Sequence, residues 1–386
     1  MSSPRRRPDV AIVGAGLVGL VMAERLTALV PGVQVLVVES SGRLGGLCAS
    51  QWNDHLGVNV HPRGTHVLAT SSRRVWAYLT AHTRVIPYRH RVFASYQGEL
   101  IPLPLGLEAV EAVYGGGLDP DQARRLVETD TAPYRGRVPL TVEDVALAKV
   151  GPRLYEAFVH GHVSKQWGVD PSKLDPEVFT SRFGLTFTRD NQYHPGSRYQ
   201  GLPAGGWGAM LHRLADRPGI RIELGRQATA DDPPEYTRAC VVTSPIDQWF
   251  GFDQGVLERR SLAVEWRRTE VREAPRAATV TYPDPSVPYY RTHAPALLPG
   301  GGATVTSSKS LVGYERHGPG EYQTDFVLRS PANKVLADAY RRHAKHLAAG
   351  GLLFAGRGAT FYDDMGTSIA AALTCATALS RRLRHA

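Results

Sequence analysis

Cysteine is scarce in this chain of 386 residues, which has only Cys48, Cys240 and Cys375. Their wide separation matches neither a zinc-ligand spacing nor a disulfide framework. No apolar run reaches the roughly 20 residues of a transmembrane helix. The opening MSSPRRRPD lacks the apolar segment of a secretory signal. These absences predict a cytoplasmic protein without a membrane span and without a metal site.

The sequence also lacks repeats, low-complexity segments and a concentrated basic stripe. Its net charge is +9, but the arginines are dispersed singly or in pairs and do not alternate with aromatic residues. Nucleic-acid binding is therefore not predicted, and a small anionic substrate accounts for the positive excess. With 42% hydrophobic residues, a chain of this length can build two or three domains.

The segment DVAIVGAGLVGLVMAERL, which starts at Asp9, combines a short buried strand, a glycine turn and a helical pattern. Its glycines are Gly14, Gly16 and Gly19, and Glu39 follows Gly19 by 20 residues at the end of a second strand. Such a turn brings backbone N–H groups close to a pyrophosphate, and the acid can accept a ribose hydroxyl. The pattern predicts dinucleotide binding; a doubly wound domain without a nucleotide is the alternative.

The next segment, ESSGRLGG, contains Ser40, Gly45 and Gly46. NAD enzymes have no general need for a second glycine pair here, whereas the chain of many two-domain flavoproteins passes close to FAD at this point. The pair therefore favours FAD, although a plain Gly-Gly turn is also common.

The remaining pattern predicts an α/β fold, in which an FAD-type Rossmann-like domain is interrupted by a helical domain and an antiparallel-sheet domain. Asp119 and Thr141 are expected helix N-caps. The expected boundaries are 1–75, 211–250 and 335–386 for the dinucleotide domain, 76–180 for the helical domain, and 181–210 with 251–334 for the sheet domain.

Several motifs occur in a characteristic order: HPRGTH, GPRLYEAFVHGHVSKQWG, RYQGLPAGGW, VVTSPIDQWF, LERRSL, VPYYR and LLFAGRGATFYDDM. In order and spacing the chain resembles the UDP-galactopyranose mutase family over nearly its whole length. The resemblance implies an isomerase that converts a nucleotide-linked hexopyranose to its furanose form, with reduced FAD attacking the anomeric carbon. We also expect a homodimer formed through the helical domain.

The resemblance assigns catalytic positions to Arg291, Arg260, His66 and Trp167. The two arginines would meet the negative charge of the departing diphosphate. On the substrate side it also implies His162, Phe158, Thr186, Asn191, Tyr199 and Tyr289. On the flavin side it implies Gly356, Arg357, Asp364 and Met365, the last two at the start of a helix.

Departures from the family pattern cluster at the ring and at the base. His162 stands for a base-stacking tyrosine, Thr186 for an arginine, Leu47 for an asparagine and Asp363 for a tyrosine. We therefore expect a substrate other than UDP-galactopyranose. A small polar residue at 162 leaves room for a purine, which favours GDP- before ADP-linked sugars, and dTDP-linked sugars remain open.

Three alternatives follow from the same residues. The first is a flavin-independent mutase, assisted by a metal at the adjacent Asp363 and Asp364. The second is an FAD-dependent oxidoreductase of the amine-oxidase kind, in which KQWG and RYQG would have no reason to recur. The third is a non-catalytic nucleotide-sugar binder, which the presence of Arg291, Arg260 and Trp167 disfavours.

Overall fold

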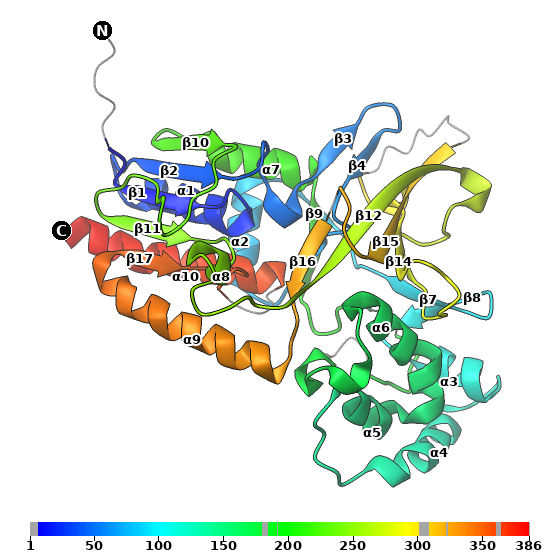
Figure 1. Cartoon of the computed structure of the whole chain (residues 1–386). Helices are drawn as coiled ribbons and strands as arrows, with labels where there is room; N and C mark the ends of the chain where they lie inside the picture. The colour runs from blue at the N-terminus through cyan, green and yellow to red at the C-terminus, as the bar shows by residue number, and fades with distance from the viewer. Residues whose placement is uncertain are drawn as a thin grey trace.

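The computed structural model describes residues 7–179, 184–190, 192–300, 309–321, 323–359 and 364–385 (Figure 1). Its first layer is a parallel five-stranded sheet in the order β10-β2-β1-β11-β17. These strands are β1 (Val10–Val13), β2 (Val35–Glu39), β10 (Ile220–Leu224), β11 (Ala239–Val242) and β17 (Leu352–Phe354). The order matches the dinucleotide domain expected from the glycine turn.

The central strands of this sheet are buried on both faces, which explains their continuous apolar sequence. Ile12 faces a core shared with α1 (Leu17–Leu29), α2 (Arg73–His82), α7 (Gly206–Ala215) and α10 (Met365–His385). Val13 faces the opposite core, beside Trp249 of α8 (Ile246–Trp249). Another helix near this domain is α9 (Pro331–Leu347), whose Tyr340 packs against Ile246.

The second layer is a seven-stranded sheet in the order β16-β12-β15-β14-β13-β7-β8. Its strands are β7 (Val92–Tyr96), β8 (Glu99–Leu103), β12 (Arg259–Glu270), β13 (Thr279–Thr281), β14 (Arg291–His293), β15 (Lys309–His317) and β16 (Gln323–Val327). All its pairings are antiparallel except β13 with β7. This is the expected antiparallel-sheet domain with one parallel contact.

A helical unit lies below this sheet in Figure 1. It consists of α3 (Leu107–Tyr114), α4 (Pro120–Thr131), α5 (Val142–Leu154), a π-helical turn (Tyr155–His160) and α6 (Gly161–Trp167). Asp119 and Thr141 are the N-caps of α4 and α5, each within a capping box, as expected. Two small sheets complete the fold, β3 (Gln51–Asn53) with β4 (Val58–Val60), and β5 (Leu68–Thr70) with β9 (Tyr199–Pro203) and β6 (Val85–Pro87).

The expected domain boundaries differ from the observed elements at three places. Residues 76–82 belong to α2, which buries Tyr78 and Leu79 in the dinucleotide core and not in the helical unit. Residues 92–103 form a β-hairpin, since Gln97 and Gly98 adopt the positive φ values that such a turn requires. The boundary at 334 falls inside α9. Within the described ranges, no helix combines the length and the apolar character needed to cross a membrane.

Candidate active site

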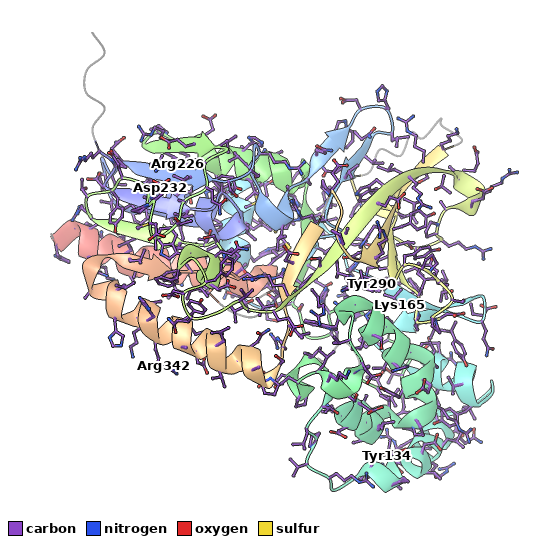
Figure 2. The ribbon with its side chains drawn as sticks, in the orientation of Figure 1. Tyr134, Lys165, Arg226, Asp232, Tyr290 and Arg342 are labelled. Carbon is purple, nitrogen blue, oxygen red and sulfur yellow. The ribbon has the colours of Figure 1, made fainter. Side chains whose placement is uncertain are left out.

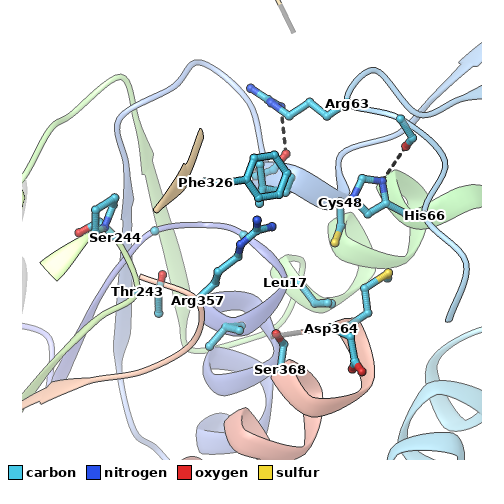
Figure 3. A pocket seen from close by; sticks show the side chains of 18 of the residues that line it. Leu17, Cys48, Arg63, His66, Thr243, Ser244, Phe326, Arg357, Asp364 and Ser368 are labelled. Carbon is cyan, nitrogen blue, oxygen red and sulfur yellow. Dashed lines mark hydrogen bonds between the residues drawn. The ribbon is translucent and has the colours of Figure 1, made fainter. Parts of the chain in front are cut away.

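A cavity of about 640 Å³ lies at the carboxyl ends of β1, β2 and β11, and the seven-stranded sheet lines its other side. Cofactor sites typically occupy roughly 300–1,000 Å³, and open parallel sheets bind ligands at this edge. The cavity is therefore of the right size and in the right place for a dinucleotide. Figure 3 shows part of its lining.

Two glycine segments meet backbone to backbone at one end of the cavity. Gly14 has φ +106°, and a Cβ there would lie 2.3 Å from Thr243 Oγ1. Gly16 pairs with Gly45 in an isolated bridge, and a Cβ on Gly46 would lie 3.1 Å from the Gly16 Cα. Gly14, Gly16 and Gly46 line the cavity. Side chains at these positions would fill the space in which backbone N–H groups face a phosphate.

Gly19 has a different role from the one expected. A Cβ at this position would lie 2.0 Å from the Gly14 carbonyl oxygen, and Gly19 is not part of the cavity lining. Its small size lets α1 pack closely on the glycine turn, which is the packing role that the third glycine of the motif plays.

Glu39 ends β2 at the cavity, as the sequence predicts. Its carboxylate accepts hydrogen bonds from the Ala15 N–H at 2.8 Å and the Ser41 N–H at 2.9 Å. Ser40 lies beside it, also in the lining. The α1 N-cap, Gly16, has no side-chain cap, so the first N–H groups of the helix are not covered from their own N-cap. The carboxylate and the helix start suit the ribose and the pyrophosphate of a dinucleotide.

Arg357 extends into the cavity between the two sheets, with its guanidinium 4.5 Å from the centre of the Phe326 ring (Figure 3). Arg63, which the sequence analysis did not single out, also lines the cavity and donates to the Gly46 carbonyl at 3.0 Å. Gly356 is not in the lining; its φ is +73° and a Cβ would lie 2.9 Å from Val18.

Asp364 and Met365 lie in the cavity wall at the start of α10. Asp364 Oδ1 accepts a hydrogen bond from the Thr367 N–H at 2.7 Å, so it acts as an N-cap. Its neighbour Asp363 lies outside the described residues. Within those residues, no group of three His, Cys, Asp or Glu side chains is arranged to hold a metal ion.

At the opposite end, a buried polar network faces the cavity from β14 and β15. Arg291 is directly opposite Glu315, with 3.8 Å between Nη1 and Oε2. His293 Nδ1 accepts from the Thr65 N–H at 3.2 Å, so its Nε2 carries the proton that it donates to Glu315 at 3.0 Å. Burial raises the pKa of Glu315, but the hydrogen bond from His293 and the charge of Arg291 outweigh burial and lower it overall. Glu315 is therefore a buried carboxylate.

His66 lines the same end of the cavity. Its Nδ1–H donates to the Gly64 carbonyl at 2.7 Å. Burial lowers the pKa of His66 to about 4, against the opposing effect of that carbonyl. The imidazole is therefore neutral at pH 7, and its Nε2 is available as an acceptor.

Trp167 and Arg260 come together around Phe326, although neither lines the cavity itself. The Trp167 ring centre lies 6.3 Å from that of Phe326. Arg260 on β12 is paired with Phe326 on β16 and forms an ion pair with Glu258 at 2.8 Å. Because Phe326 does line the cavity, both residues are placed directly behind its wall.

Other expected substrate residues lie away from the cavity. Tyr199 stacks on Trp76, with ring centres 5.2 Å apart and an angle of 15° between their planes. Tyr289 packs against Tyr282 and Tyr314 on the opposite side, whereas its neighbour Tyr290 lines the cavity. The motif was expected to present Tyr289, whereas the structure places the adjacent Tyr290 in the cavity lining.

Of the remaining expected residues, Phe158 and His162 are buried in the helical unit, whereas Thr186 is exposed. Phe158 packs on Tyr96 at 5.0 Å, inside the core of that unit. His162 is 5% exposed and meets the Tyr290 ring edge-on at 5.5 Å. The Thr186 N–H donates to the Leu105 carbonyl, outside the cavity lining. Asn191 lies outside the described residues.

Sequence reasoning missed several residues of the lining. These are His90, Gln166, Tyr193, His194, Tyr290, His293 and Glu315. The alternation of β14 could have indicated His293, because Arg291 and His293 are two residues apart and share a face. Glu315 carries no local signal, since it joins the site only through the pairing of β14 with β15.

Comparison with known proteins agrees with this geometry. The family model for UDP-galactopyranose mutase matches residues 157–362, and that for an NAD(P)-binding Rossmann-like domain matches residues 12–81. A probable UDP-galactopyranose mutase of Klebsiella pneumoniae is 29% identical over 95% of this chain and 94% of its own length. A dTDP-fucopyranose mutase of Escherichia coli is 27% identical over 95% and 97%.

Solved structures share the fold. A reduced UDP-galactopyranose mutase superimposes with a TM-score of 0.73 at 15% identity, over 96% of this chain and 95% of that one. A cyclohexylamine oxidase from Brevibacterium oxydans reaches 0.61 at 15% identity, over 98% and 100%. The fold alone is thus common to mutases and oxidases, and the family match separates them. The chain is an FAD-binding isomerase that acts as a nucleotide-sugar mutase, and it belongs to the UDP-galactopyranose mutase family.

Proposed function

We propose that this enzyme interconverts the pyranose and furanose forms of a hexose linked to a nucleoside diphosphate other than UDP, with a dTDP-linked sugar as the first candidate. The observation that supports a base other than uracil is the similarity to a relative named for dTDP-fucopyranose. The spatial argument for a purine does not apply, because His162 is buried against Tyr290 and Thr186 lies off the cavity.

The buried network around Arg291 supports the proposed chemistry at the sugar–diphosphate bond. When bound, FAD in its reduced form supplies the nucleophile for the anomeric carbon. Arg291 provides fixed positive charge for the diphosphate as its bond to the sugar breaks, and a water-poor site makes that charge more effective. Glu315 helps to hold the guanidinium in place, since its Oε2 lies 3.8 Å from Arg291 Nη1 and is itself fixed by the hydrogen bond from His293.

Neutral His66 has a complementary role in this proposal. Because Gly64 fixes its Nδ1–H, the ring presents only its Nε2 lone pair as a hydrogen-bond acceptor to the cavity. A neutral acceptor can orient a sugar hydroxyl or a ring N–H group without adding positive charge near the anomeric carbon.

The test is a side-by-side measurement of kcat/KM with UDP-galactopyranose, dTDP-fucopyranose and a GDP-linked hexose, with the enzyme reduced by dithionite. We expect the dTDP sugar to be preferred and activity to require reduction. A tenfold preference for UDP-galactopyranose would overturn the choice of base. Absence of turnover with all three sugars by flavin-loaded enzyme would overturn the assignment of these substrates.

We also propose a cytoplasmic homodimer formed through the helical unit. Apolar side chains are exposed there: Val138 is 82% and Leu140 75% exposed, with Leu126 on the neighbouring helix α4. Light scattering of the wild type and of a Val138→Asp, Leu140→Asp double variant tests this surface. We expect the wild type to be a dimer and the double variant to be a monomer. A dimeric double variant would show that the dimer contact lies elsewhere. Fractionation of the native cells tests the location.

A further inference from the structure

We propose that Lys165 is a positioning residue, which fixes the separation between the substrate wall formed by α6 and the wall formed by Tyr290 and Arg291. The role in turnover depends on the proposed function, whereas the structural coupling can be measured without it. Lys165 lies two residues before Trp167 and one before Gln166, which lines the cavity. Figure 2 shows Lys165 beside Tyr290 at the junction of the helical unit and the sheet.

The Lys165 ammonium group donates to three backbone carbonyls on the segment that joins β13 to β14. Its Nζ lies 2.8 Å from the Tyr282 oxygen and 3.4 Å from the Tyr289 oxygen, and it also bonds the Asp284 oxygen. An ammonium group has three N–H donors, so its full donor capacity is directed at one loop. That loop ends at Tyr290 and Arg291, both in the cavity lining.

The loop is itself hydrogen-bonded to the sheet, so the position of α6 affects the position of the cavity residues Tyr290 and Arg291. The Tyr282 N–H donates to the Tyr290 carbonyl at 2.8 Å, and the Tyr290 N–H donates to the Glu315 carbonyl at 2.9 Å. Lys165 therefore holds a closed hydrogen-bonded turn whose far end carries Arg291. Removing the ammonium would leave three carbonyls of that turn without this donor.

Close packing at the start of α6 leaves no room for the turn to shift inwards. A Cβ on Gly161 would lie 1.9 Å from the Pro283 carbonyl oxygen. One residue later, His162 meets the Tyr290 ring edge-on. Gly161 and Lys165 are four residues apart and therefore share a face of the helix, which is the face in contact with the turn.

The other end of α6 is seated on the same sheet. Gly168, which ends the helix with φ +65°, packs on His317 of β15; a Cβ there would lie 2.3 Å from His317 Nε2. Helix α6 thus contacts β15 directly at its end and the β13–β14 turn along its side. Lys165 is the cation that bonds the side of α6 to this turn, although it does not itself line the cavity.

The test compares Lys165→Met and Lys165→Arg with the wild type and with Lys173→Met, a control lysine that is exposed on the neighbouring 3-10 turn. Hydrogen exchange of residues 282–291 reports the turn, and flavin content reports the dinucleotide end. For Lys165→Met we expect at least tenfold faster exchange at Tyr282 and Tyr290, unchanged flavin content and kcat/KM lower by on the order of tenfold to a hundredfold. Lys165→Arg should recover part of the loss, because it keeps the charge but its planar fork cannot match three converging carbonyls.

Gly161→Ala provides a second variant if Lys165→Met does not fold. The added methyl group should displace the turn and reproduce the same exchange pattern, whereas Gly116→Ala, which meets no atom within 4 Å, should not. Exchange within twofold of wild type in both Lys165→Met and Gly161→Ala would overturn the proposal. So would faster exchange with unchanged kcat/KM. If the wild type turns over no nucleotide sugar, the proposed function fails separately. The affinity for dTDP and UDP, measured by calorimetry, then replaces turnover as the readout. Affinities of Lys165→Met within threefold of those of the wild type would in that case overturn the positioning role.

Discussion

At the dinucleotide end of the cavity the chain presents mainly backbone, through Gly14, Gly16 and Gly46. At the opposite end it presents ionisable side chains, namely the partly exposed Arg291 and the buried His293 and Glu315. The first end needs empty space and properly directed N–H groups, which a short contiguous segment can provide. The second needs charges held apart from water, which requires residues from several strands. Under the proposed function, binding of the cofactor and chemistry on the substrate therefore depend on separable parts of the molecule.

The largest effect is expected from Arg291→Ala at the substrate end. Loss of one charged hydrogen-bonding group from a departing phosphate costs about 2–4 kcal/mol of transition-state stabilisation. We therefore expect kcat/KM to fall on the order of 30- to 1,000-fold, with flavin content unchanged. Arg267→Ala on the same sheet is the matched control, since Arg267 is exposed and pairs with Glu265. A value of kcat/KM within threefold of wild type would contradict the role of Arg291.

Gly14→Ala should produce the opposite pattern, with loss of cofactor. An alanine at φ +106°, with its Cβ 2.3 Å from Thr243 Oγ1, costs roughly 1–3 kcal/mol and distorts the phosphate turn. We expect the purified variant to contain much less flavin, measured as the ratio of flavin to protein absorbance. Gly42→Ala is the control, because a Cβ there meets no atom within 4 Å. Full flavin content in Gly14→Ala would show that the turn tolerates a side chain.

Glu24 shows that a buried charge is not by itself a mark of the substrate end, because this carboxylate lies in the dinucleotide half and serves structure and not chemistry. It accepts hydrogen bonds from Arg25 at 2.6 Å and from Tyr78 at 3.0 Å, and His82 Nε2 lies 3.1 Å away. Burial raises the pKa of Glu24, but hydrogen bonds from His82 and Arg25 outweigh burial and lower it from 4.5 to about 2.

The pH dependence of stability follows from the sign of that shift. The unfolded chain takes up the proton first, so the contribution of Glu24 is complete above pH 4.5 and is lost as the pH falls towards 2. A shift of this size corresponds to on the order of 3 kcal/mol. Urea unfolding at pH 7 and pH 3 should show a smaller loss of stability for Glu24→Gln than for the wild type. Equal losses would assign the acid sensitivity to other groups.

The smallest expected effect is the change in the protonation of His66, at the substrate end, with pH. Because burial lowers its pKa to about 4, its imidazole should not titrate between pH 5.5 and 8. Its side-chain NMR signals, assigned by comparison with His66→Gln, should stay constant over that range. A titration near pH 6.5 would show that the ring becomes charged in the active site.

The dinucleotide end was predictable because its signals are local. Gly14, Gly16 and Glu39 belong to one strand–turn–helix–strand unit, and the structure places all three in the cavity. Gly19 was predicted as a cofactor contact but packs against the Gly14 carbonyl, because spacing alone cannot separate approach to a ligand from approach to a neighbouring turn. The helix caps Asp119 and Thr141 were also local, and both were correct.

The substrate end was only partly predictable. Arg291 was identified through its motif, but the partners that hold it were not, since Glu315 follows it by 24 residues and meets it through strand pairing. Tyr289 and Tyr290 differ only in the side to which they point, and the motif VPYYR does not specify that side. His162 was expected at an open base site, and its burial against Tyr290 depends on how α6 docks.

The sequence by itself determined the family, the FAD-type turn, the alternation of helical and sheet segments and the central arginine, because each is written in contiguous residues whose chemistry does not depend on distant partners. Only the tertiary structure decided which side chains share the cavity and which are held behind its wall. The coupling of Lys165 to the turn before Arg291 joins residues more than a hundred positions apart, and the protonation of His66 depends on burial. Both are consequences of packing, which a chain acquires only when its elements come together.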